Sequence, residues 1–280
     1  MSIFTDNPFR NNPVLEREVR GRLRLKRRGT AALWTAAPIA LVALYFYTRG
    51  LIALAHGLQQ DARDLWGLFA YGALVLIVLL APALSSTAIT QEREQQTWDA
   101  LAATRLTGAE IIGGKWLGRQ LIPLLIIGIA LPFLIGSAVR GQLPAGQVVA
   151  TLAFLVVTSG FYGALGLLCS FGGRRSAGAT ATALTMTILL CLGTYVVSTV
   201  IDLLTAHGNG NFNSPVLWIN PFYAMTALQD SLKPSSDSSG YDLTGAANGE
   251  VVSVYFFLTL LALAGFLALM VRRYTRAVGR

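Results

Sequence analysis

The residues with the chemistry to act on a nucleotide are a glycine and a lysine near the middle of the chain. Gly114 and Lys115 stand together, as they do at the end of a phosphate-binding loop, whose pattern is G-x-x-x-x-G-K-[ST]. That pattern also requires a glycine five residues before Gly114 and a hydroxyl residue after the lysine. Ala109 and Trp116 occupy those two positions, so the sequence excludes a nucleotide-binding loop in this chain.

Residues that hold metals or activate nucleophiles are equally scarce. The chain has two histidines, His56 and His207, and two cysteines, Cys169 and Cys191. They are too few and too scattered for a zinc or haem site, and the predicted spans contain no histidine that could pair with a serine such as Ser159. We therefore expect no metal site, no cofactor and no catalytic residue in this chain, and any energy it uses must come from elsewhere.

The composition is that of a membrane protein. Of the 280 residues, 54% are hydrophobic and 13% are charged, and the mean hydropathy is +0.55, whereas soluble domains carry about 25% charged residues. A transmembrane helix needs about 20 mostly apolar residues, and six uncharged runs are long enough. The sequence therefore predicts an all-α, polytopic membrane protein with six transmembrane helices, at about residues 30–48, 65–90, 120–139, 147–170, 176–201 and 251–271.

The distribution of basic residues predicts the orientation of these spans. Lysine and arginine accumulate in cytoplasmic loops, and 18 of the 22 basic residues fall in alternate segments that include both termini. The cytoplasmic segments then carry a net charge of +11 and the outer segments −3. The first residues do not have the pattern of a cleavable signal peptide. We therefore expect a multi-pass protein of the bacterial plasma (inner) membrane, with a cytoplasmic N-terminus (1–29), a transmembrane domain (30–272) and a cytoplasmic tail (273–280).

A basic amphipathic helix is predicted ahead of the first span. Leu15, Val19 and Leu23 repeat at helical spacing and form one face, while arginines that include Arg24 and Arg27 occupy the rest. Such a helix lies along a membrane surface, and each basic residue contributes roughly 1 kcal/mol near an anionic leaflet. Two roles stay open, a simple anchor to membrane lipids or a specific role beside a partner subunit.

The connection between the second and third spans, residues 91–119, is longer than antiparallel helices require. Glu92 and Glu94 stand where the second span ends, and Trp98, Leu101 and Arg105 follow at helical spacing. This spacing predicts a short amphipathic helix with an exposed aromatic residue.

A second short helix is predicted directly after it. Thr107 and Glu110 have the spacing of a capping box, in which each side chain bonds the backbone amide of the other residue. The two helices would form a cytoplasmic knob whose apolar side chains a membrane lining does not require. Either a partner protein binds this knob, or Trp98 and Trp116 only seat at the lipid headgroups.

The centres of the predicted spans contain no ionisable residue. Ion-coupled carriers depend on such groups for their relays, so the sequence argues against a secondary transporter. The outer loop, residues 202–250, contains an aromatic, apolar part with four candidate gate residues: Trp218, Pro221, Phe222 and Tyr223. Their alternative role is anchoring at the membrane interface.

Three segments resemble the permease subunits of ABC-2-type ABC transporters. Members of that family often begin with an N-P-hydrophobic-hydrophobic-x-[KR]-E segment, matched at residues 12–18. After the second span they carry an E-R-E-x-x-T loop that runs into a G-K-hydrophobic segment, matched at residues 92–97 and 114–116. Residues 215–223 look like their outer re-entrant element, and the six-span layout with both ends inside fits the whole chain.

The resemblance implies an ATP-driven exporter in which this chain and a second permease, identical or related, form the translocation path. ATP and Mg²⁺ would bind in a separate ABC ATPase subunit, and no nucleic acid is expected as a partner. The rival hypothesis is a membrane anchor or assembly protein that recruits a cytoplasmic partner without transport. The residues implied to contact the ATPase are Glu92, Arg93, Glu94, Thr97, Trp98, Leu101, Leu106, Thr107, Glu110 and Lys115.

Overall fold

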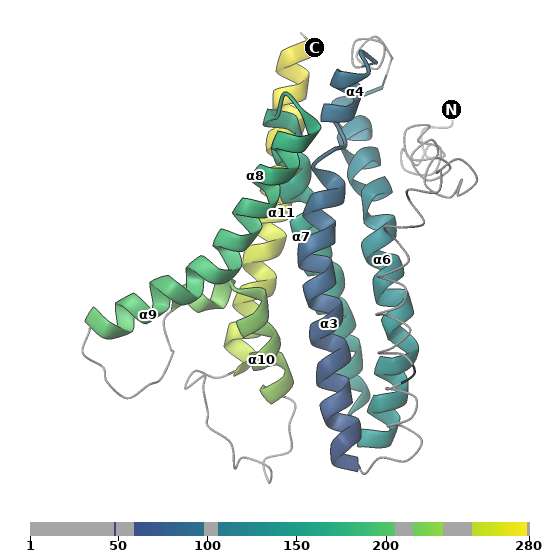
Figure 1. The fold of residues 1–280 in the computed structure, drawn as a ribbon, viewed down its shortest axis with the longest axis vertical. Helices are drawn as coiled ribbons and strands as arrows, with labels where there is room; N and C mark the ends of the chain where they lie inside the picture. The colour runs from purple at the N-terminus through teal and green to yellow at the C-terminus, as the bar shows by residue number, and fades with distance from the viewer. Residues whose placement is uncertain (1–47, 49–58, 98–105, 205–214, 232–247, 279–280) are drawn as a thin grey trace, which may run out of the picture.

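The computed structural model describes residue 48 and residues 59–97, 106–204, 215–231 and 248–278, and every regular element in these residues is a helix (Figure 1). This confirms the all-α class for the described part of the chain. The longer helices are α3 (Gln59–Ser85), α6 (Gly108–Gly141), α7 (Ala145–Gly172), α8 (Ser176–Ile188) and α11 (Asn248–Val278). The shorter ones are α4 (Thr90–Glu94), the π-helix η2 (Leu189–Gly193), α9 (Thr194–Leu204), the 3-10 helix η3 (Pro215–Ile219) and α10 (Pro221–Ser231).

Within the described residues, five helical stretches are long and apolar enough to cross a membrane. They are α3 continued into α4, α6, α7, the run from α8 through η2 into α9, and α11. These stretches overlap the second to sixth predicted spans. The predicted first span, 30–48, lies outside the described residues except for residue 48, and so does the predicted interfacial helix with its residues Leu15, Val19, Leu23, Arg24 and Arg27.

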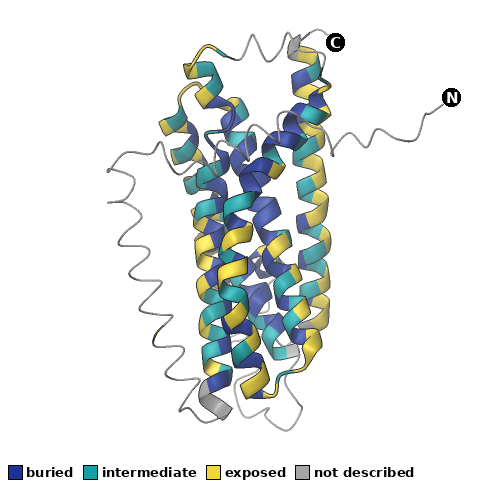
Figure 2. Cartoon of the chain, turned by 90° about the vertical axis from the view of Figure 1, so that its right-hand side faces the viewer, coloured by how far each residue is buried: buried dark blue, intermediate teal, exposed yellow. Residues whose placement is uncertain are grey.

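Helix α7 lies at the centre of the bundle. It packs against α3, α6, α8, α10 and α11 and is the most buried of the five stretches. Helix α3 approaches it so closely that a Cβ on Gly166 would lie 2.3 Å from the carbonyl oxygen of Pro82, so only glycine fits at this crossing. Figure 2 shows the buried residues turned toward the interior of the bundle and the exposed residues on its outside.

Helix α6 is longer than a membrane is thick. Its 34 residues span roughly 50 Å, against roughly 30 Å of hydrocarbon, so about 13 of them extend beyond it. The sequence predicted a separate short helix before the third span, and the structure corrects this. Residues 108–119 form the first turns of α6 itself, because the cap at Thr107 starts a helix that continues without a break to Gly141.

The fourth stretch is interrupted by η2 between α8 and α9. A π-helix displaces backbone hydrogen bonds from their regular partners and allows a helix to bend, and Figure 1 shows α9 slanting away from the bundle. The Cys191 carbonyl within η2 accepts a hydrogen bond from Asn220 Nδ2 at 2.6 Å. Asn220 stands between η3 and α10, so this bond ties the outer segment to the interruption in the fourth stretch.

Candidate functional site at the end of α3 and α4

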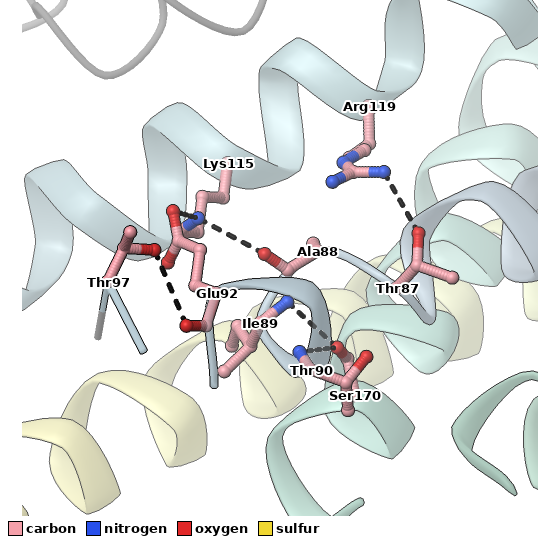
Figure 3. A network of polar contacts seen from close by, with 9 residues as sticks. All are labelled: Thr87, Ala88, Ile89, Thr90, Glu92, Thr97, Lys115, Arg119 and Ser170. Atoms are coloured by element: carbon pink, nitrogen blue, oxygen red, sulfur yellow. Dashed lines mark hydrogen bonds and ion pairs between the residues drawn. The ribbon is translucent and has the colours of Figure 1, made fainter. Parts of the chain in front are cut away.

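The candidate site is built around α4, the five-residue helix that follows α3. A helix this short is unstable by itself, and residues from other helices hold it in place (Figure 3). The Ser170 Oγ on α7 accepts hydrogen bonds from the amides of Ile89 at 2.9 Å and Thr90 at 3.1 Å. Ser170 is fully buried, and it satisfies the first amides of α4 as a capping residue would.

An ion pair joins α4 to α6. The Lys115 Nζ lies 2.6 Å from Glu92 Oε1 and also donates to the Ala88 carbonyl oxygen at 3.2 Å (Figure 3). The Lys115 side chain has no exposed surface, and that of Glu92 is 15% exposed. A buried ammonium is costly without a partner of opposite charge, so the ammonium and the carboxylate depend on each other for their places in the fold.

Arg93 joins α4 to the end of α7. Its Nη1 donates to the Gly173 carbonyl oxygen at 3.1 Å, and its guanidinium carbon lies 5.7 Å from the centre of the Phe171 ring. That distance is within the range of a cation–π contact. The cation therefore lies against the carbonyl end of α7, where a helix dipole favours positive charge.

Glu94 joins α4 to the start of α8. Its Oε1 accepts from the Ser176 amide at 2.7 Å, and its Oε2 accepts from the Ser176 hydroxyl at 2.6 Å. A carboxylate is favoured at the amide end of a helix. Hydrogen bonds from Ser176, with the nearby charge of Arg175, lower the pKa of this exposed carboxyl below its usual range. Three consecutive residues of α4 thus hold three different helices.

The start of α6 is capped as the sequence predicted. The Thr107 Oγ1 accepts from the Glu110 amide at 3.3 Å, and the Glu110 Oε2 accepts from the Thr107 amide at 2.7 Å, which confirms the capping box. The hydrogen bonds from Thr107 lower the pKa of the Glu110 carboxyl. Leu106 packs beside Ile111 and Tyr274, so the same turn also contacts the last part of α11.

The comparison with known families decides what kind of protein carries this site. The family model of ABC-2 family transporter proteins matches residues 32–277. The chain belongs to the ABC-2 transporter family. It is therefore a multi-pass membrane protein and a permease component of an ABC transporter, a class that associates with an ABC ATPase and is generally not catalytic itself. The chain matches no curated protein.

In this ABC-2 permease, the residues that the sequence implied to contact the ATPase divide into exposed and internal ones. Trp98 and Leu101 lie outside the described residues. Lys115 was expected among the partner contacts, but its side chain is fully buried, so in this structure it supports α4 from within. Thr97 Oγ1 donates to the Glu92 carbonyl oxygen at 3.4 Å. The described members of the predicted set are Glu92, Arg93, Glu94, Thr97, Leu106, Thr107, Glu110 and Lys115.

Three residues of the permease site carried no signal in the sequence. Ser170 and Ser176 bind α4 from 80 or more positions away, and only the fold brings them there. Arg119 is buried on α6 and donates from Nη1 to the Leu84 carbonyl oxygen at 2.9 Å and to Thr87 Oγ1 at 3.1 Å. These bonds hold the turn between α3 and α4, where the backbone leaves the regular helix.

The predicted outer residues lie at the other end of the bundle. Pro221 is the first residue of α10, and the Asn220 Oδ1 caps this helix by accepting from the Phe222 amide at 2.8 Å. Tyr223 is buried and Trp218 is partly buried, and both belong to a cluster with Val251 at the start of α11. Trp218 and Tyr223 therefore pack against the start of the last span.

Proposed function

We propose that this chain is the permease subunit of an ATP-driven exporter in a bacterial plasma membrane, with both termini in the cytoplasm. A separate ABC ATPase binds ATP and Mg²⁺ and docks at the α4 end, and a second permease, identical or related, completes the translocation path. The observation that carries the proposal is the geometry of α4. Glu92, Arg93 and Glu94 contact α6, the end of α7 and the start of α8, respectively.

The docking surface in this proposal is the segment that follows α4. Gln96, two residues after the end of α4, adopts a left-handed conformation with φ of 57°, which is incompatible with continuing the helix. Gln95 and Gln96 are exposed. The predicted amphipathic residues Trp98 and Leu101 come next along the chain, and their apolar face is suited to a hydrophobic groove on the ATPase.

The proposed path from the ATPase to the outer side runs through α8. Glu94 holds the first residue of α8, Ser176, and the π-helix that follows α8 is bonded to Asn220. A displacement of α4 would therefore move α8 as a rigid body and carry the movement to η3 and α10. Trp218 and Tyr223 on that outer segment then serve as the gate. Rigid-body movement of packed helices is a common form of such transitions.

Two substitutions separate docking from transmission. Trp98→Asp places a charge on the proposed docking face, and we expect it to lower recovery of the ATPase subunit when the permease is purified in mild detergent. Glu94→Ala removes the acceptor for both Ser176 bonds and leaves the docking face intact. We expect normal recovery of the ATPase but weaker stimulation of ATP hydrolysis in reconstituted vesicles.

Glu250→Gln is the matched control, because Glu250 is an exposed carboxylate at the start of α11. It should behave as the unmodified protein in both assays. If no ATPase subunit accompanies the permease, the chain acts as an anchor or assembly protein instead. If Glu94→Ala stimulates hydrolysis as strongly as the unmodified protein does, the proposed path through α8 is wrong.

A further inference from the structure

A cavity of about 610 Å³ lies between the end of α7 and the first turns of α8. Three glycines, Gly172, Gly173 and Gly178, line it together with Arg174, Arg175 and the Cys169 thiol. A Cβ added at Gly172 or Gly178 would meet no atom within 4 Å, so the absence of these side chains leaves the cavity open. Its volume is in the range of roughly 300–1,000 Å³ that small-molecule sites occupy.

The charge around the cavity is positive. Arg174 and Arg175 are both exposed at the turn between the two helices. Arg175 interacts with the Glu94 carboxylate, whose two oxygens are already engaged by Ser176. Arginine binds phosphate oxygens through its planar fork of N–H donors. The pair of guanidiniums therefore suits a phosphate ester better than an uncharged ligand.

The surroundings of the cavity are those of a lipid site. Most of its lining is apolar, and the fourth stretch exposes Met186, Ile188 and Leu189, along which a lipid tail would pass. The cavity itself lies at the end of two membrane-spanning helices. Basic pockets between transmembrane helices at this level bind lipid headgroups. A phosphate with acyl chains attached would satisfy both the arginines and the apolar wall.

We propose that this cavity binds the phosphate headgroup of an anionic phospholipid of the cytoplasmic leaflet. The proposal takes its orientation from the proposed function, but it does not depend on an ATPase partner. Because Arg175 and Ser176 also face Glu94, a bound phosphate would adjoin the contact between α4 and α8. The composition of the inner leaflet would then influence how firmly α4 holds α8.

The Cys169 thiol reports on occupancy of the cavity. It lines the cavity, whereas Cys191 is buried in η2, so the second thiol serves as an internal control. The full-length protein is placed in phosphatidylcholine nanodiscs with increasing phosphatidylglycerol, treated with N-ethylmaleimide, and digested for mass spectrometry. We expect phosphatidylglycerol to slow alkylation of Cys169, while Cys191 stays unmodified as long as the bundle is intact, because its thiol is buried.

Two variants and one control locate the effect. Arg174→Gln should raise the phosphatidylglycerol fraction needed for half-protection by about fivefold, the contribution of one basic residue near an anionic leaflet. Gly178→Leu should protect Cys169 without added lipid, because its side chain enters the open space of the cavity. Arg272→Gln removes an exposed arginine on α11 that does not line the cavity, and it should leave the lipid dependence unchanged.

The same assay can overturn the proposal. Equal alkylation of Cys169 at every phosphatidylglycerol fraction would exclude a bound anionic lipid. If Arg174→Gln needs the same phosphatidylglycerol fraction as the unmodified protein to half-protect Cys169, Arg174 does not bind the lipid. Soluble glycerol phosphate is added to phosphatidylcholine nanodiscs as a further arm. If it protects Cys169 as well as the lipid does, the site takes a soluble phosphate ester. None of these readouts involves ATP hydrolysis, so they are independent of the coupling experiment.

Discussion

Replacing Lys115 with methionine tests whether a buried ion pair holds α4 on α6. Methionine keeps most of the volume of the lysine side chain but removes its charge. The substitution would leave the Glu92 carboxylate without its partner at 2.6 Å and the Ala88 carbonyl oxygen without the donor at 3.2 Å. Breaking a buried pair by removing one member costs about 3–5 kcal/mol. Because Glu92 is 15% exposed and can recruit water, we expect about 3 kcal/mol.

A double-mutant cycle isolates the pair from other effects of the substitution. The free energy of unfolding is measured by denaturant titration in detergent micelles for Lys115→Met, Glu92→Gln and the double variant. Glu92→Gln should also cost about 3 kcal/mol, because it leaves the fully buried ammonium unpaired. The double variant should cost less than the sum of the two by about 1–3 kcal/mol, since it removes both charges together.

Additive costs would refute this reasoning. If the double variant equals the sum of the single variants to within about 0.5 kcal/mol, the two charges do not stabilise each other. Arg272→Met is the matched control, since it removes an exposed basic residue of α11. Its effect should stay within about 0.5 kcal/mol. A larger effect in the control would mean that loss of positive charge in general, and not this pair, lowers stability.

Two further predictions concern packing and the outer segment. Gly166→Ala should cost about 1–3 kcal/mol of unfolding free energy, because its Cβ would collide with the Pro82 backbone. Gly128→Ala, whose Cβ meets nothing within 4 Å, should stabilise α6 by up to about 1 kcal/mol, and an equal loss in both variants would contradict the packing argument. Asn220→Ala should lower the thermal midpoint because α10 loses its cap and the Cys191 carbonyl its donor. Asn220→Ser should recover about 1 kcal/mol by restoring the capping oxygen alone, and no difference between these two variants would remove the capping role.

The local features of the site were predictable from the sequence. The capping box at Thr107 and Glu110 depends on two residues three positions apart, so their types alone predicted the hydrogen bonds that the structure has. The apolar runs likewise predicted where the long helices lie, because an uncharged stretch of about 20 residues has few other stable conformations in a membrane. The sequence divided residues 108–139 into a short helix and a transmembrane span. The structure has one helix, α6, because nothing in residues 108–119 marks a helix end.

The contacts of α4 were beyond local reasoning. Each of its charged residues was expected to face a partner protein, yet Glu92 binds Lys115 on α6, and Glu94 binds Ser176 on α8. The sequence shows that these positions hold a serine and a lysine, but it does not show which part of the protein each side chain contacts. That information depends on the order and the heights at which α3, α6, α7 and α8 pack, and the packing follows from side-chain shape across the whole bundle.

The sequence by itself was enough to predict a helical, multi-pass membrane protein, because charge scarcity and the length of apolar runs are properties of composition and order. The tertiary structure decided what the charged residues after α3 do. Through-space pairing of residues up to 82 positions apart requires close approach of helices, and the approach at Gly166 is possible because no side chain stands between α3 and α7. A short helix that alone would not persist is thereby held against three others.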